Sequence, residues 1–93
     1  MKATAELQMI PLGEGVSVRQ QVQQVLDILH EYNFVLETHA SGTNIEGNMD
    51  DILAVVKLCH ETLHQSGSIR LISYIKFETR IDKIPTLAGK RLE

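Results

Sequence analysis

The chain has 93 residues, of which 43% are hydrophobic and 23% are charged, and its formal net charge is −3. Most domains contain roughly 100–150 residues, so this length predicts a single domain over residues 1–93, and the apolar content excludes a disordered chain. The negative charge argues against nucleic-acid binding, which needs a basic surface. The single cysteine, Cys59, excludes an internal disulfide. The N-terminus has no signal pattern and no apolar run reaches roughly 20 residues, so we expect a cytoplasmic protein outside the membrane.

The first third of the chain predicts a strand followed by a helix. Residues 4–12 alternate between two faces, which is typical of a half-buried strand. Pro11 and Gly13 should end it, because proline has no N–H for strand pairing and glycine allows the chain to turn. Residues 18–32 carry apolar side chains at helical spacing. Ser17 and Gln20 stand where a capping box would begin this helix.

Two short strands and a second helix follow. The strands are predicted at 34–39 and 43–46, with a turn between them. Residues 49–65 place apolar side chains on one stripe of a helix. Asn48 is a suitable N-cap for this helix, and Gly67 suits the left-handed position after its end.

The last predicted element completes a recognisable order of strands and helices. Residues 69–81 alternate over the longest stretch in the chain and predict the final strand. The order β-α-β-β-α-β predicts an α+β fold, the ferredoxin-like sandwich, with a four-stranded antiparallel sheet and two helices on one face. Right-handed crossovers would place the first and third strands at the centre. This architecture carries many functions, so function must come from particular residues.

The string His60-Glu61-x-x-His64 on the second predicted helix matches the zinc-protease motif. In that motif two histidines one turn apart bind zinc, and the glutamate activates the metal-bound water. The extended motif needs a third histidine where this chain has Arg70, and a guanidinium has no lone pair to offer. The alternative is that both histidines flank the core stripe near the helix end, where they complement the helix dipole. We therefore predict no metal site and no catalytic residues, with a zinc-dependent hydrolase as the weaker alternative.

The face of the predicted sheet that lies away from the helices is a second candidate site. A solvated face should be polar, but four residues add apolar area, which favours contact with a ligand or a second subunit. These residues are Ile10, Val35, Ile72 and Tyr74. Carboxylates on the central strands could there hold a cationic or amidine-like ligand. The polar residues predicted on the central strands of this face are Glu6, Gln8, Asn44 and Glu46.

Short motifs recur along nearly the whole chain, and the set is specific in this order and spacing. They are Ala5-Glu6 leading to Ile10-Pro11-Leu12-Gly13, then Gly42-Thr43-x-Ile45-Glu46-Gly47, Cys59-His60-Glu61, Gly67-x-x-Arg70, Ile75-Lys76, Arg80-x-Asp82-Lys83 and Lys90. This set resembles the small thiamine-binding, ferredoxin-like proteins. The resemblance implies binding of thiamine or its hydroxymethylpyrimidine portion, as a ligand and not as a cofactor, without turnover, by a homodimer or homotetramer.

Thiamine carries a cationic thiazolium and an aminopyrimidine that donates from its amine and accepts at its ring nitrogens. Side chains near the sheet centre offer matching donors and acceptors. We expect Glu46 or Glu6 to pair with the pyrimidine edge, and Thr43 and Asn44 to fix its orientation. The expected ligand-binding residues are Glu6, Gln8, Thr43, Asn44 and Glu46.

The chain also departs from the family it resembles. Members often carry a serine where Gln8 stands, and a Ser-x-Tyr where this chain has Arg19-Gln20-Gln21. The competing hypothesis is therefore a structural or regulatory interaction module, in which the open face builds an oligomer and binds no small ligand.

Overall fold

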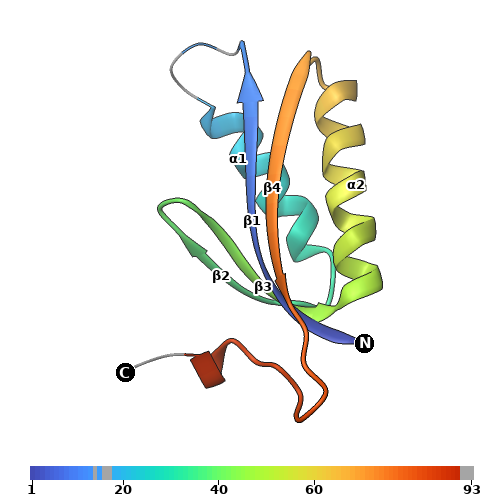
Figure 1. Cartoon of the computed structure of the whole chain (residues 1–93). Coiled ribbons are helices and arrows are strands. Elements are labelled where there is room, and N and C mark those ends of the chain that lie inside the picture. Colours follow the sequence, from blue (N-terminus) through green and yellow to red (C-terminus); the bar gives the residue numbers. More distant parts are fainter. Residues whose placement is uncertain (14, 16–17, 91–93) are drawn as a thin grey trace.

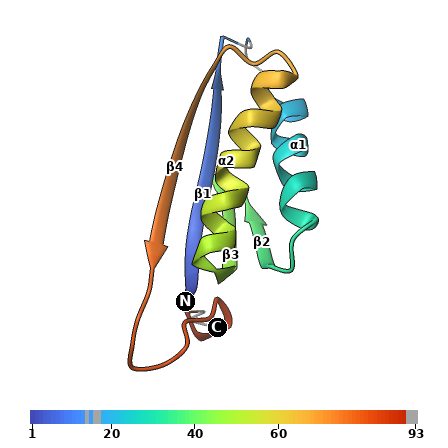
Figure 2. The same cartoon turned by 90° about the vertical axis from the view of Figure 1, so that its right-hand side faces the viewer.

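The computed structural model describes residues 1–13, 15 and 18–90, and within them a four-stranded antiparallel sheet carries two helices on one face (Figures 1 and 2). Its strand order is β2-β3-β1-β4, so the first and third strands are central and the predicted fold is confirmed. The elements are β1 (Lys2–Leu12), α1 (Arg19–His30), β2 (Val35–His39), β3 (Gly42–Asn48), α2 (Met49–Gln65), β4 (Arg70–Glu78) and a short 3-10 helix, η1 (Ala88–Lys90).

The core lies between the sheet and the two helices, because alternate residues of the central strands point toward the helices. Burying each large aliphatic side chain contributes about 1.5–3 kcal/mol, and this layer holds helices and sheet together. The fully buried members with the largest side chains are Leu29, Ile45, Ile52, Leu63, Val55 and Cys59.

The first strand begins two residues before the predicted 4–12 and ends at the predicted residue. β1 spans Lys2–Leu12 and Gly13 follows it, but Pro11 lies inside the strand and does not interrupt it. β1 pairs with β3 only as far as Leu7, whereas its pairing with β4 extends to Leu12. Pro11 therefore lies in the half of β1 that has a neighbour on one side only, where proline is tolerated.

The two helices differ in how well their ends were predicted. α2 has the predicted bounds: Asn48 Oδ1 accepts the N–H of Asp50 at 2.9 Å, and Gly67 has a φ of 109°. α1 is shorter than the predicted 18–32, and Val18 at its N-cap makes no capping bond through its side chain. The predicted capping box depends on Ser17, which lies outside the described residues.

The final strand is shorter than predicted at both ends. β4 spans Arg70–Glu78, and its pairing with β1 ends at Glu78 and Thr4, two residues before β1 itself ends at Lys2. The chain instead runs past the end of the sheet where β1 begins, and then returns toward β3 (Figures 1 and 2). We call residues 79–90 the C-terminal segment. Its Leu87 is only 6% exposed.

Within the described residues, neither helix is both long enough and apolar enough to span a lipid bilayer.

Candidate ligand-binding site

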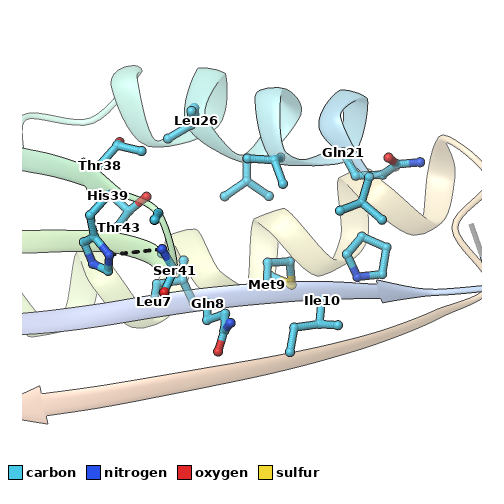
Figure 3. Close-up of a pocket in the computed structure, with 16 residues that line it drawn as sticks. Leu7, Gln8, Met9, Ile10, Gln21, Leu26, Thr38, His39, Ser41 and Thr43 are labelled. Atoms are coloured by element: carbon cyan, nitrogen blue, oxygen red, sulfur yellow. Dashed lines mark hydrogen bonds between the residues drawn. The ribbon is translucent and has the colours of Figure 1, made fainter. Parts of the chain in front are cut away.

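A pocket of about 330 Å³ lies between α1, the second half of β1 and the β2–β3 hairpin (Figure 3). We call it the helix pocket. It forms because the hairpin stops beside Leu7 while β1 continues to Leu12, which leaves α1 facing a strand without a neighbour on the β3 side. Its lining is 7–11 from β1, 38–43 from the hairpin, and Val18, Gln21, Val22, Val25 and Leu26 from α1 and its N-cap.

The walls of the helix pocket are apolar with a few polar groups. Leu7 and Met9 contribute apolar surface from β1, opposite the valines of α1. Thr38 and Thr43 are direct partners across the hairpin, so their side chains lie side by side on the face toward the helices. Gln21 adds a half-buried amide from α1. Apolar walls with a few orienting hydrogen-bonding groups are typical of small-molecule sites.

A second concavity, of about 590 Å³, lies on the opposite face of the sheet. We call it the open-face groove. Its floor contains a row of paired residues across the sheet, in which Asn44 pairs with Glu37 and Glu6, and Glu6 pairs with Lys76. Glu6 Oε1 lies 4.0 Å from the Lys76 ammonium. The complete lining is Thr4, Ala5, Glu6, Glu37, Asn44, Lys76, Phe77, Glu78, Leu87 and Lys90.

The structure divides the five predicted ligand-binding residues between two faces of the sheet. Glu6 and Asn44 come together in the open-face groove, because they are direct partners in the pairing of β1 with β3. Thr43 lies in the helix pocket instead, because adjacent residues of a strand point to opposite faces. Thr43 and Asn44 therefore line different concavities on opposite faces of the sheet.

Gln8 and Glu46 lie in different places. Gln8 belongs to the lining of the helix pocket, although its side chain lies on the side of β1 away from α1, beyond the end of β3 (Figure 3). Glu46 Oε1 accepts the backbone N–H of Leu87 at 2.8 Å, so this carboxylate holds the C-terminal segment. Glu78 lies across Thr4 from Glu46 in the sheet and is paired with Lys90, and this contact lowers the pKa of the Glu78 carboxyl.

Two of the predicted ligand-binding residues, Gln8 and Thr43, belong to the lining of the helix pocket, and sequence reasoning missed the others. Thr38 could have been found, because a hairpin whose turn follows His39 makes it the partner of Thr43. Gln21 also had a signal, because it stands where the resembling family often carries the tyrosine of its Ser-x-Tyr motif. Ser41 had none, since its place in the lining depends on how far the hairpin extends.

His39 lies where the two concavities approach each other. The Ser41 backbone N–H donates to His39 Nδ1 at 3.3 Å (Figure 3). His39 Nε2 lies 3.2 Å from Asn44 Oδ1 and 3.4 Å from Glu6 Oε2. The ring therefore touches the hairpin turn on one side and the open-face groove on the other.

The histidines of the zinc-like motif have structural partners. His60 Nε2 lies 2.8 Å from Ser73 Oγ and so connects α2 to β4. His64 Nδ1 donates to the Ser68 carbonyl at 2.7 Å, next to the end of α2. In the part of the chain that the structure describes, no three His, Cys, Asp or Glu side chains gather as a metal site would require. Cys59 is fully buried, and this burial raises the pKa of its thiol to about 11.

Comparison with known proteins connects this fold to a family. Residues 5–92 match the family described as thiamine-binding protein. The UPF0045 protein sll0230 of Synechocystis sp. is 42% identical over 90 residues, which cover 97% of this chain and 74% of that protein. The UPF0045 protein MJ1052 of Methanocaldococcus jannaschii is 37% identical over 89 residues, which cover 96% of this chain and 88% of that protein.

Solved structures share the whole architecture. The crystal structure of MJ1052 superposes with a TM-score of 0.89, covering 96% of this chain and 91% of that one. A Thermotoga maritima structure, described as a candidate thiamine biosynthesis/salvage protein, has a TM-score of 0.85 at 20% identity. It covers 97% of this chain and 95% of its own, and at that identity it supports the fold alone. Because the family match and these relatives extend over nearly the whole chain, the protein belongs to the thiamine-binding protein family.

Proposed function

We propose that the protein binds thiamine, or its hydroxymethylpyrimidine portion, in the helix pocket and releases it unchanged. The observation that carries this proposal is the helix pocket itself, about 330 Å³ with apolar walls and a pair of threonine hydroxyls, in a chain of the thiamine-binding family. A volume of roughly 300 Å³ or more is typical of small-molecule sites.

The chemistry of the lining suits an aminopyrimidine. The amine of the ring is a donor and its nitrogens are acceptors, while the hydroxyls of Thr38 and Thr43 can each donate and accept. The amide of Gln21 offers both a donor and an acceptor from the opposite wall. The faces of the ring would pack on Met9 and Val25. A net charge of −3 favours approach of a cationic thiazolium.

Binding without turnover is supported by the kinds of side chain around the helix pocket. The described lining contributes Thr, Ser and Gln side chains, and its one titratable group is His39. Both nitrogens of His39 already have partners within the protein. A general base must accept a proton from the substrate within hydrogen-bond reach, and the imidazole nitrogens of His39 are already occupied by contacts within the protein.

Calorimetric titration with thiamine, and separately with hydroxymethylpyrimidine, tests the proposal. We expect saturable binding of both, and weaker binding by Thr43→Val, which keeps the shape of the side chain and removes its hydroxyl. Thr79→Val, on the exposed segment after β4, is the matched control and should bind as the wild type does. A ligand at 100 times its dissociation constant should stabilise the fold by about 2.7 kcal/mol. If the wild type shows no heat of binding and no thermal shift, thiamine is excluded as the ligand.

The open-face groove is the other place where a cationic ligand could bind. Its carboxylates Glu6 and Glu78 line a larger and more polar space. Glu78→Gln separates the two locations, since Glu78 lies far from the helix pocket lining and in the groove lining. Unchanged affinity in Glu78→Gln with a loss in Thr43→Val would assign the ligand to the helix pocket. The reverse pattern would assign it to the groove.

A second candidate function is an oligomeric interaction module, and the exposed apolar residues of the open face favour it. Val35 is 51% exposed and Tyr74 is 62% exposed on this face. We propose that the protein forms a homodimer or homotetramer through this face, whose mixed charges offer both signs to a second copy. Oligomer formation with no response to thiamine would favour a purely structural or regulatory role.

A further inference from the structure

The β2–β3 turn forms one wall of the helix pocket, and it lies directly against β1. Ala40, Ser41 and Gly42 all belong to the lining. A Cβ atom at Gly42 would lie only 2.6 Å from the carbonyl oxygen of Leu7, so the backbones approach too closely for any side chain. Because the β2–β3 turn packs directly against β1, any displacement of the turn changes the shape of the helix pocket.

One imidazole connects this turn to the other face of the sheet. His39 is the last residue of β2, and its Nδ1 receives the N–H of Ser41 at 3.3 Å. A backbone N–H can only donate, so Nδ1 accepts and the hydrogen of the neutral ring lies on Nε2. Nε2 therefore donates toward Asn44 Oδ1 at 3.2 Å, with the Glu6 carboxylate at 3.4 Å.

The partners of Nε2 lie on the two central strands, which are the most firmly held part of the sheet. Glu6 and Asn44 are direct partners in the β1–β3 ladder. A ring fixed to both of them has a defined orientation, and its Nδ1 lone pair then defines where the Ser41 N–H must lie. The hydrogen-bonded chain runs from Glu6 and Asn44 through His39 to Ser41.

We propose that His39 is a positioning residue for the helix pocket. By holding Ser41 on one side and Asn44 with Glu6 on the other, it fixes the hairpin turn relative to β1 and keeps the wall next to Thr43 in the geometry that the ligand needs. This inference rests on the proposed function, because it assigns a role in the affinity of the same pocket. His39 acts through the turn and not by contact with the ligand.

The test compares thiamine affinity among variants at position 39. His39→Phe keeps an aromatic ring and removes both nitrogens. His39→Asn retains an acceptor for the N–H two residues onward, as in an Asx-turn, but is too short for Glu6. His30→Phe, at the exposed C-terminal end of α1, is the matched control.

We expect His39→Phe to weaken binding about five- to tenfold, the effect of losing one ordinary hydrogen bond, and His30→Phe to leave it unchanged. His39→Asn should recover most of the loss. Glu6→Gln should weaken binding in the wild type but not in His39→Phe, since Glu6 acts only through the imidazole. Amide exchange at Ser41 should accelerate in His39→Phe and return toward normal in His39→Asn.

The outcomes separate this inference from the proposed function. If the wild type binds thiamine and His39→Phe binds it equally well, the role of His39 is wrong while the proposed function stands. The same conclusion follows if His39→Asn restores protection of the Ser41 amide without restoring affinity. If the wild type binds neither thiamine nor hydroxymethylpyrimidine, both proposals fall together.

Discussion

The backbone N–H of Leu87 donates to Glu46 Oε1 at 2.8 Å, and this bond joins residues that are 41 positions apart in the sequence. Leu87 is buried, and Lys90 of the same segment pairs with Glu78 at the end of β4. The C-terminal segment is therefore anchored at two points along the open face.

The first prediction concerns this anchor. Glu46→Ala should lower the free energy of unfolding by about 1 kcal/mol, because the Leu87 N–H loses its acceptor. Glu46→Gln keeps an acceptor oxygen and should lose less. Urea denaturation gives the stability, and amide exchange at Leu87 reports on the bond directly. Equal protection of the Leu87 amide in Glu46→Ala and in the wild type would contradict the anchor. Since Glu46 lies on the face opposite the helix pocket, Glu46→Gln should also bind thiamine normally.

A second prediction uses two glycines to separate stability from binding. Gly42→Ala would place a Cβ 2.6 Å from the Leu7 carbonyl oxygen, and Gly47→Ala would place one 2.5 Å from the Phe34 ring. Overpacking of this kind costs typically 1–3 kcal/mol, so both variants should melt at lower temperature. Only Gly42→Ala should weaken thiamine binding, because Gly42 lines the helix pocket and Gly47 does not.

One result with the two glycine variants would contradict this prediction. If folded Gly47→Ala loses affinity as much as Gly42→Ala does, the loss follows general destabilisation and the hairpin turn has no special part in the pocket. Titration well below the melting temperature of each variant keeps the two effects apart.

The third prediction concerns pH. Burial raises the pKa of the Cys59 thiol from 9.0 to about 11, so the unfolded chain ionises at lower pH than the folded one. The contribution of the neutral thiol to stability is complete below pH 9 and is lost as the pH rises from 9 toward 11. Urea denaturation across this range should show a steeper decline for the wild type than for Cys59→Ala. An identical slope would mean that the thiol is not protected. Native protein should also react slowly with thiol reagents.

A fourth prediction tests the open face as a subunit contact. Light scattering should give the mass of a dimer or tetramer for the wild type. Val35→Glu and Tyr74→Glu should reduce that mass, because each places a charge in an apolar contact. Leu53→Glu on the outer side of α2, where the side chain is 50% exposed, is the control and should not change it. A monomeric wild type would refute this contact.

Local patterns in the sequence predicted the fold because they record burial. The alternation of β1 and β4 and the helical spacing of α2 each report which face meets the core, and the bounds of α2 follow from Asn48 and Gly67. Proline usually favours the end of a strand, but Pro11 lies inside β1. A strand tolerates proline where only one neighbouring strand pairs with it, and β1 beyond Leu7 pairs with β4 alone.

The candidate site was predicted less completely than the fold. The alternation of a strand already sends the neighbours Thr43 and Asn44 to opposite faces, so the sequence itself argues against one shared site for them. Residues such as Gln21 and Leu87 reach their places through contacts across the chain that no local period records. Which residues share a pocket depended on the β1–β3 register, and a single sequence leaves that register open.

The unequal lengths of β1 and the hairpin have a consequence for how this fold acquires ligands. One more pair of residues in each arm of the hairpin would carry β3 past Leu7 toward Met9, and sheet would occupy the space where the pocket lies. Pro11, without an N–H, opposes continuation of that pairing further along β1. The length of the hairpin thus determines whether this pocket exists, and insertions or deletions there would create or abolish the cavity while leaving every core side chain in place.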